Sequence, residues 1–441
     1  MTATATAQAT TAQTASTQTA STQKASTQTA STPAATAHTA TAEAPGLTFT
    51  KPFTQQEPLS DAAIAAATRV MQGGRLHRYN TLAGETAEAS LLERAYADWQ
   101  GAAYCVATTS GGQAMQLALR AVGVRPGDRV LSNAFTLAPV PGALHAVGAE
   151  VVLVEIGRDW LIDLDDLADK AASNGARVLM LSHMRGHIAD MEAILAVCDA
   201  HGIALIEDCA HTMGARWKGR RSGSFGRIGC FSTQTYKHLN SGEGGFVTTD
   251  DADLAARMVI MSGSYMLHDR HGAAPGPAAF ERVKLDMPNL SCRMDNLRAA
   301  ILRAELPMID GRIARWNALY RAMEAALGGV DGIETRQRPD EEAYVGSSFQ
   351  FHVTGAAARH IPAIVAACGT RGVDLKWFGA DQPHGFTSRY DSWRYLGPQP
   401  ALPRTLAALS TTIDLRLPLT FQPDDCAVIG RIIAEEVAAH R

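Results

Sequence analysis

Between residues 129 and 207 the sequence alternates between short apolar runs and stretches with helical periodicity, and this alternation restricts the fold more than any other feature. We expect strands at 129–136, 150–155, 178–182 and 204–207, with helices at 137–147, 165–172 and 189–201. Apolar runs that alternate with helices predict a mostly parallel sheet covered on both faces. Ligands bind such sheets beyond the carboxyl ends of the strands. We therefore expect an α/β fold with its site at that edge.

Polar side chains follow two of these predicted strands. Asp208 and His211 come after the strand at 204–207, and Arg185 comes after the strand at 178–182. A carboxylate at the end of a buried strand either caps the next helix or pairs with a buried cation, and capping is the commoner role. A pyridine nitrogen would also need such an anion to stay protonated. The residues alone leave both roles open for Asp208.

One lysine, Lys237, lies inside a stretch that is poor in charge and rich in small residues, FGRIGCFSTQTYKHLNSGEGG at 225–245. The glycines Gly242, Gly244 and Gly245 let the backbone adopt positive φ and approach a ligand closely. A lysine among hydroxyls and backbone amides loses its proton more easily than a surface lysine, which is the condition for forming a Schiff base. An ordinary lysine in a surface loop is the alternative.

A glycine turn opens a predicted helix in TTSGGQAMQLALRAVG at 108–123, after a strand-like run at 104–108. Ser110 is placed to cap this helix, and the free N–H groups at its start make an anion site. Phosphate binding and plain capping fit equally well. The earlier loop at 73–80 carries His77 and Tyr79, which are either substrate contacts or ordinary surface groups.

The net charge, the lengths of the apolar runs and the cysteine pattern exclude several classes of protein. The 441 residues carry a net charge of −4, which provides no basic footprint for nucleic acid. No run of about 18 apolar residues predicts a membrane span. The seven cysteines match neither a zinc spacing nor a secreted disulfide framework, so we expect no metal site and a reducing cytoplasm.

Three domains are expected. Residues 1–45 are nearly all Thr, Ala, Ser and Gln with a TASTQ repeat, which predicts a disordered tail. Residues 46–310 would form the large α/β domain. After 310 the pattern changes to helices around a strand-like SFQFHV at 348–353, which predicts a smaller α+β domain at 311–441.

In combination, four motifs are more specific than any one of them. Their order is SGGQAMQLAL, IEDCAH, FSTQTYK and SGEGGFVTTD. This order resembles the DegT/DnrJ/EryC1/StrS family of pyridoxal-phosphate-dependent sugar aminotransferases, with fold type I. The spacing from Ser232 to Lys237 and from Lys237 to Gly242 matches that family. The segments HMRGHIADMEAI at 183–194 and LRLPLTFQPDD at 415–425 also resemble it, so the likeness covers nearly all of the chain after the tail.

The resemblance implies a role for each residue. Lys237 would hold pyridoxal 5'-phosphate as a Schiff base and move the proton during catalysis, and Asp208 would pair with the pyridine nitrogen. His211 stands where the family often has Gln, near the ring hydroxyl. Phosphate contacts would come from Ser232, Gly111, Gly112 and Gln113.

The chain departs from the family pattern at several positions. Gly112 replaces a Thr, and Ser291 falls where the family usually has an Asn that reaches the neighbouring subunit. Leu137 falls where an aromatic side chain commonly stacks on the cofactor ring. Phe135, two residues earlier, would point to the same side if the segment is extended, so we expect it to stack instead.

The sequence therefore predicts an aminotransferase that moves an amino group from glutamate or glutamine to a keto sugar, keto cyclitol or related carbonyl compound. Its product would serve a cell-surface glycan or a secondary metabolite. His77, Tyr79 and Arg185 are candidate substrate contacts, and the resemblance implies a homodimer with shared sites. The alternatives are a lyase, epimerase or decarboxylase with the same cofactor, or a non-catalytic regulator on this fold.

Overall fold

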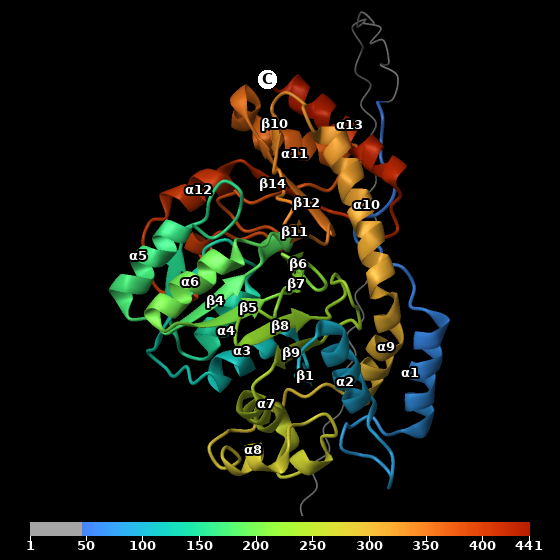
Figure 1. Cartoon of the computed structure of the whole chain (residues 1–441). Helices are drawn as coiled ribbons and strands as arrows, with labels where there is room; N and C mark the ends of the chain where they lie inside the picture. Colours follow the sequence, from blue (N-terminus) through green and yellow to red (C-terminus); the bar gives the residue numbers. More distant parts are fainter. Residues whose placement is uncertain (1–45) are drawn as a thin grey trace, which may run out of the picture. The chain divides into compact units, whose positions relative to one another are not determined.

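A seven-stranded sheet forms the centre of the computed structural model, which describes residues 46–441 (Figure 1). Its strand order is β1 (Tyr104–Thr108), β9 (Gly245–Thr249), β8 (Ile228–Ser232), β5 (Ala204–Asp208), β4 (Val178–Ser182), β2 (Arg129–Asn133) and β3 (Glu150–Val154). From β8 to β3 all neighbours are parallel, whereas β9 runs antiparallel to both β8 and β1. The predicted α/β fold with a mostly parallel sheet is confirmed. The predicted tail at 1–45 lies outside the described residues.

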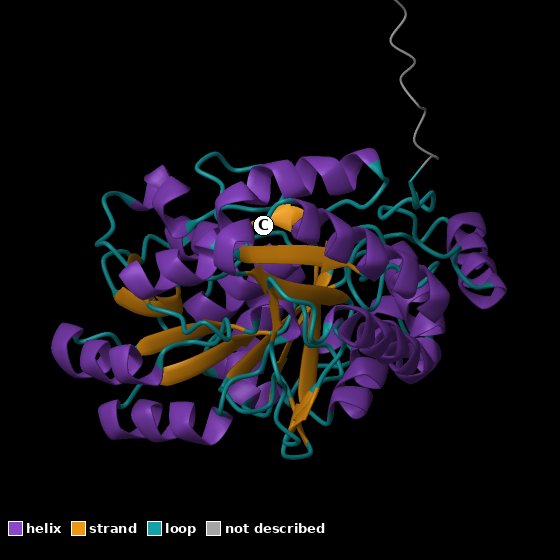
Figure 2. Ribbon diagram, turned by 90° about the horizontal axis from the view of Figure 1, so that it is seen from above, coloured by secondary structure: helices purple, strands orange, loops and turns teal. Residues whose placement is uncertain are grey.

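Helices cover both faces of this sheet (Figure 2). On one face pack α3 (Gly111–Ala121), α4 (Pro139–Ala146) and α7 (Ala252–Val259). On the other face pack α2 (Glu88–Gln100), α5 (Leu164–Asn174), α6 (Met191–His201) and α9 (Asn296–Glu305), while α1 (Asp61–Gly73) packs on α9. Along β4, Met180 joins the first core, whereas Leu179 and Leu181 join the second. Successive strand residues point to opposite faces, so a continuous apolar run serves both cores.

A four-stranded antiparallel sheet lies in the C-terminal part of the chain. Its order is β10 (Ile333–Thr335), β12 (Ser348–Val353), β14 (Thr412–Arg416) and β13 (Lys376–Trp377). Its core is shared with α10 (Ile309–Leu327), α11 (Ile361–Thr370) and α13 (Pro423–Ala439). A third, small sheet joins β11 (Glu342–Ala343) to β6 (Arg216–Trp217) and β7 (Arg220–Arg221).

The chain before α1 belongs to the same core as the C-terminal sheet. Phe49 and Phe53 pack edge-on against Phe421, with ring centroids 5.1 and 5.0 Å away. Residues 46–441 form one compact unit by their internal contacts. The division of this unit near residue 310 stays a prediction.

The chain between β9 and α9 contains short helical pieces besides α7. These are η2 (Ile260–Ser264), η3 (His268–Arg270) and α8 (Pro277–Glu281). The helices α9 and α10 are separated by η4 (Leu306–Met308), where Pro307 lacks the N–H that a continuous helix needs. The remaining elements are η1 (Met184–Gly186), η5 (Gly355–His360), η6 (Tyr390–Ser392), η7 (Arg394–Leu396) and α12 (Pro403–Ser410). Among residues 46–441, no helix combines the length and apolar character needed to cross a membrane.

Candidate active site

A cavity lies at the carboxyl ends of β4, β5 and β8, the edge predicted from the strand pattern. The side chains and backbone that line it include six of the predicted site residues, namely Gly111, Gly112, Asp208, His211, Ser232 and Lys237. They come from two connections after strands and from the start of α3. The folding of the sheet therefore brings together residues that are far apart in the sequence.

The loop that carries Lys237 is held by its own backbone. Lys237 N–H donates to the Gln234 carbonyl, and Thr235 N–H donates to the carbonyl of Gly242. The glycines are required by space: at Gly244, where φ is 147°, a Cβ would lie 2.3 Å from Thr233 Oγ1. At Gly245 a Cβ would lie 2.7 Å from the backbone nitrogen of Gly111. The glycine cluster thus lets this loop approach the start of α3.

The amine of Lys237 is a weak base. Burial lowers its pKa to about 7, Asp208 opposes this shift, and the guanidinium groups of Arg185 and Arg416 lower the pKa further. A large fraction of the side chain is consequently neutral near pH 7 and able to attack a carbonyl carbon.

His211 contacts this amine, because its Nε2 lies 2.8 Å from Lys237 Nζ. The other ring nitrogen, Nδ1, accepts the backbone N–H of Arg185 at 3.2 Å. A backbone N–H only donates, so Nε2 carries the ring proton in the neutral histidine. Burial, followed by the charge of Lys237, holds the pKa of His211 well below its usual value. His211 is therefore a fixed neutral donor that faces the amine.

The carboxylate of Asp208 is oriented by hydrogen bonds. Oδ2 accepts the hydroxyl of Ser182 at 2.9 Å, and that hydroxyl accepts the Thr136 hydroxyl at 2.8 Å. Oδ1 accepts the backbone N–H of Ala210 at 3.1 Å. Asp208 is buried and borders the cavity. The carboxylate is thus presented to the cavity as an acceptor.

Backbone N–H groups at the start of α3 face the cavity. The first N–H groups of a helix have no partner inside it, and Gly111 and Gly112 border the cavity together with Ser232. A Cβ at Gly111 would lie 2.9 Å from the Cβ of Ser232, so only glycine allows this approach. Gln113 differs from the prediction, because its N–H donates to Ser110 Oγ at 3.1 Å and it does not line the cavity. Ser110 therefore caps the helix, while the two glycines present the N–H groups that remain.

Phe135 does not border the cavity, contrary to the expectation. It is 1% exposed and packs edge-on against Phe378, with ring centroids 4.9 Å apart. Leu137 and Val140 form this part of the wall. The strand ends at Asn133. Side chains alternate between two faces only in an extended strand, so Phe135 and Leu137 need not point to the same side.

The three predicted substrate residues lie outside the cavity lining. Tyr79 is buried, and its hydroxyl lies 2.9 Å from His271 Nδ1, beside the buried pair of Arg78 and Glu93. Burial raises the pKa of Tyr79 to about 12. His77 accepts a hydrogen bond from Arg293 Nε at 3.0 Å. Arg185 lies behind His211 and pairs with Asp414.

Two residues beside the cavity were missed by the sequence analysis, Ser182 and Arg416. Ser182 ends the strand at 178–182, so its position at the carboxyl edge was a usable signal. Arg416 lies inside the segment 415–425 that carried part of the resemblance, but nothing in the sequence brings it near Lys237.

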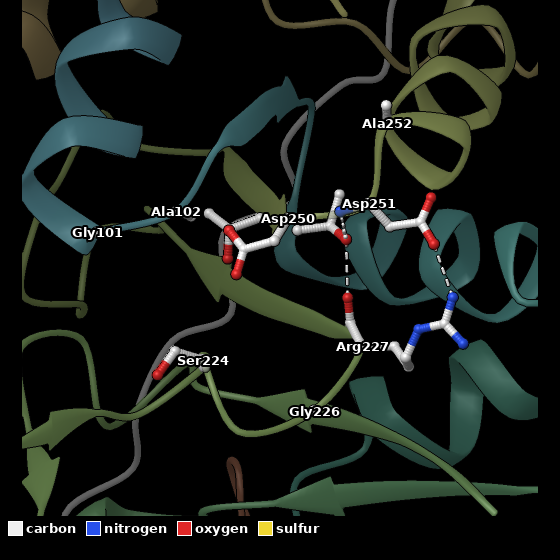
Figure 3. Close-up of a pocket in the computed structure, with 11 residues that line it drawn as sticks. Gly101, Ala102, Ser224, Gly226, Arg227, Asp250, Asp251 and Ala252 are labelled. Carbon is white, nitrogen blue, oxygen red and sulfur yellow. Dashed lines mark hydrogen bonds and ion pairs between the residues drawn. The ribbon is translucent and has the colours of Figure 1, made fainter. Parts of the chain in front are cut away.

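A separate hollow of about 360 Å³ lies at the opposite end of β8 and β9, at Arg227 and Asp251 (Figure 3). There Arg227 Nη2 lies 2.7 Å from Asp251 Oδ2, and Asp250 Oδ1 accepts the N–H of Ala103. The charged groups are already paired with each other, so this hollow provides no catalytic arrangement.

A buried trio of His183, Glu207 and Cys209 lies within metal-ligand distance, and its carboxylate is fully engaged. Glu207 accepts the ring N–H of His183 and three backbone N–H groups, those of Gly223, Phe225 and Gly226. This hydrogen-bond network fastens the turn before β8 to the end of β5.

The chain is similar to a family of known aminotransferases. A model of the DegT/DnrJ/EryC1/StrS aminotransferase family matches residues 59–432. The L-glutamine:2-deoxy-scyllo-inosose aminotransferase of Streptomyces fradiae is 31% identical over 311 residues, which cover 70% of this chain and 71% of that protein. The dTDP-3-amino-3,4,6-trideoxy-alpha-D-glucose transaminase of Streptomyces venezuelae is 32% identical over 293 residues, covering 66% of this chain and 72% of that protein.

The protein Spr1654 of Streptococcus pneumoniae, solved in its PLP form, shares the fold. Its TM-score is 0.73 at 18% identity, and the alignment covers 89% of this chain and 100% of that chain. The fold-type I architecture that the resemblance implied is thereby confirmed. Because the family model spans most of the sequence and both relatives align over two thirds or more of their own length, the chain belongs to the DegT/DnrJ/EryC1/StrS aminotransferase family.

Proposed function

We propose that this aminotransferase uses pyridoxal 5'-phosphate, held at the carboxyl edge of the sheet by Lys237, Asp208 and the start of α3. The chemistry of the donors supports the fit. A neutral lysine amine suits an aldehyde, a carboxylate suits a pyridine nitrogen, and free helix N–H groups suit a phosphate. The cradle at Gly111, which a Cβ would fill, leaves room at the phosphate end. When bound, the cofactor supplies the electron sink for breaking the Cα–H bond of the amino donor.

The residues around the ring would then act as follows. Lys237 Nζ would hold the cofactor through its aldehyde and would move the proton at Cα of the amino donor. Asp208, oriented by Ser182, would keep the pyridine nitrogen protonated. His211 would donate from Nε2 to the cofactor, because Arg185 N–H holds its other ring nitrogen as an acceptor. Apolar side chains of Leu137 and Val140 cover part of the cavity wall and exclude water there.

The substrates follow from the relatives. We propose glutamine or glutamate as the amino donor and a keto cyclitol or keto sugar as the acceptor. The Streptomyces fradiae relative is named for glutamine and 2-deoxy-scyllo-inosose, and the Streptomyces venezuelae relative is named for an amino sugar. The single observation that carries this proposal is Lys237, a weakly basic amine that shares its cavity with Asp208 and Ser232.

We propose a homodimer with shared active sites in the reducing cytoplasm. In support of the dimer, large apolar side chains are exposed between η2 and α9, with Tyr265 60%, Met266 57% and Leu285 85% exposed. Ser291, at the position where the family usually has Asn, is exposed in the same segment. In support of the compartment, all seven cysteines are free and buried.

The test is a visible spectrum of the purified protein with added pyridoxal phosphate, before and after borohydride. We expect a visible absorbance band, which borohydride should abolish while it fixes the cofactor covalently on Lys237. Without borohydride, the band should disappear when glutamine or glutamate is added, with release of the matching 2-oxo acid. Lys237→Ala should show neither. A wild-type protein that takes up no cofactor would contradict the proposal. A protein that takes it up, but releases no 2-oxo acid, would instead support the lyase, epimerase or decarboxylase alternative.

A further inference from the structure

A second cavity borders Lys237, between residues 56–59, which precede α1, and the side chains of Arg312 and Trp316 on α10. Among the described residues, Lys237 alone lines both this cavity and the one proposed for the cofactor. The volume of this second cavity is about 40 Å³, which is room for about three water molecules at roughly 10–15 Å³ each. We call it the rear cavity.

The rear cavity joins partly exposed side chains at its rim to buried ones further in. The side chain of Glu57 at the rim is 32% exposed, whereas His238 is 3% exposed. The charged groups at the rim are paired with other charges, because Glu57 accepts a hydrogen bond from Arg315 at 2.6 Å and Glu305 accepts one from Arg312. Since these charges are already satisfied, the rear cavity suits a neutral ligand such as water.

His238, which lines the rear cavity, has one ring nitrogen that the protein leaves unpaired. Its Nε2 lies 2.9 Å from Oγ of Ser347, and the ring packs edge-on against Trp316 with centroids 5.0 Å apart. Nδ1 is buried and makes no hydrogen bond with the described residues. Whichever nitrogen carries the proton, Nδ1 is an unpaired donor or acceptor, which is unfavourable in a buried place. Water satisfies either case because it both donates and accepts.

His238 and the amine of Lys237 lie within electrostatic reach of each other. Burial lowers the pKa of His238 to about 3, and the charge of Lys237 contributes to this shift. The imidazole is therefore neutral near pH 7, so it can hold a water molecule by a hydrogen bond without taking up a proton itself. Such a water molecule would lie in the cavity that Lys237 also borders.

We propose that water in the rear cavity exchanges protons between the amine of Lys237 and bulk solvent, with Nδ1 of His238 as the inner anchor of this water. In each exchange one N–H proton of the lysine ammonium passes to water and one water proton passes to Nζ, so atoms and charge balance. This inference rests on the proposed function, in which Nζ moves the proton at Cα of the amino donor. His238 is a positioning residue, because it holds the water and not the reacting atoms.

Three substitutions of His238 separate the two ring nitrogens. His238→Asn places a polar amide group where Nδ1 lies, whereas His238→Gln places it near the position of Nε2, and His238→Leu removes both. His360→Leu, at an exposed histidine of η5, is the control and should match wild type. An anchor at Nδ1 requires His238→Asn to behave like wild type and His238→Gln to behave like His238→Leu.

The first measurement uses the protein free of cofactor, so it does not depend on the proposed function. Acetic anhydride acylates only neutral amines, and the rate of labelling at Lys237 as a function of pH, followed by mass spectrometry, gives the pKa of this amine. Water beside the amine stabilises its charged form, so the pKa of Lys237 should be lower in His238→Leu and His238→Gln than in wild type and His238→Asn. The same pKa in all four proteins would overturn the proposal, as would a crystal structure in which the rear cavity is dry.

The second measurement follows the proton during a single turnover. Glutamine or glutamate with deuterium at Cα reacts with protein loaded with pyridoxal phosphate, and mass spectrometry gives the share of deuterium that remains on the cofactor. Wild type should lose nearly all of it to water. His238→Leu and His238→Gln should retain several-fold more, up to about one third, because an ammonium group carries three equivalent protons. Equal retention in wild type and His238→Leu would overturn the proposal. Wild type that shows the difference in pKa but never reacts with an amino donor would keep the rear cavity as the water path to Lys237 and refute only the proposed function.

Discussion

His211 Nε2 lies 2.8 Å from Lys237 Nζ, while its Nδ1 accepts the backbone N–H of Arg185. This contact sets the direction of the hydrogen bond, from a neutral imidazole to a neutral amine. It therefore requires the lysine to lose its proton, which agrees with a Lys237 pKa of about 7. The amine of this family member is prepared for reaction before the cofactor arrives.

Capture of pyridoxal phosphate should consequently depend on pH. Burial stabilises the neutral amine, so the reactive fraction of Lys237 is small below pH 7 and rises as the pH passes the pKa of about 7. The second-order rate of cofactor uptake should increase from pH 6 to about pH 8 and then level off. Stopped-flow absorbance gives this profile. A rate that keeps rising toward the ordinary lysine value of 10.5 would show that the amine is not perturbed.

Ser182→Ala should lower kcat about 10-fold, because the Asp208 carboxylate loses the hydroxyl that orients it, an effect typical of groups behind a functional side chain. Ser132→Ala is the matched control, since Ser132 is a buried serine whose hydroxyl has no hydrogen-bond partner in the described part of the chain. Steady-state kinetics and the cofactor dissociation constant are the measurements. Equal effects of the two changes would argue against a role for Ser182.

Gly111→Ala should weaken cofactor binding strongly, by more than about 10-fold, because its Cβ would lie 2.9 Å from Ser232 Cβ and displace the phosphate donors. Gly112→Ala places its Cβ 3.7 Å from Ser110 Oγ, an ordinary contact, and should have a much smaller effect. Fluorescence titration with pyridoxal phosphate compares them. The reverse order would place the phosphate away from the start of α3.

Glu93→Gln should lower the free energy of unfolding by about 3–5 kcal/mol, because it leaves the buried guanidinium of Arg78 unpaired. Glu85→Gln, in the exposed pair with Arg75, is the control and should change stability little. Urea unfolding measures both. A small effect of Glu93→Gln would mean that water reaches the buried pair.

The pKa of Glu93 also predicts how the stability of the protein falls in acid. The pKa of Glu93 is lowered to about 2: burial alone would raise it, but the charges of Arg78 and His271 and their hydrogen bonds outweigh burial. A depressed pKa contributes stability above the unfolded-state value, and this contribution is lost as the pH falls from about 4.5 toward 2. Wild type should therefore lose more stability over this interval than Glu93→Gln, as measured by unfolding at several pH values.

Much of the candidate site could be predicted from the sequence because it depends on local signals. Short apolar runs between helices predict parallel strands, and the residues that follow such strands share one edge of a sheet. Asp208 and His211 were predicted in this way, whereas Lys237 was predicted from the glycine-rich stretch around it. Gly111 was found because a glycine turn before a helix leaves N–H groups free, and its cradle against Ser232 agrees with that reading.

Other features depended on partners that sequence order does not reveal. Tyr79 was expected to contact substrate or to lie on the surface of a polar loop, yet it is buried and its hydroxyl lies 2.9 Å from Nδ1 of His271, 192 residues later. Phe135 looked like a stacking ring, but the strand ends before it and Phe378 covers it. Nothing in the sequence predicts a contact for Arg416, which β14 places over the ring of Tyr236.

By itself, the sequence determined the order of strands and helices, the lysine and the acid that follow the strands, and the turn at α3. These properties follow from hydrophobic periodicity and backbone conformation, which act over a few residues. Only the tertiary structure decided which charges are paired, which rings line the cavity and which arginine lies beside Lys237. Burial and ion pairing depend on distances between segments that are hundreds of residues apart, and only the packed chain sets those distances.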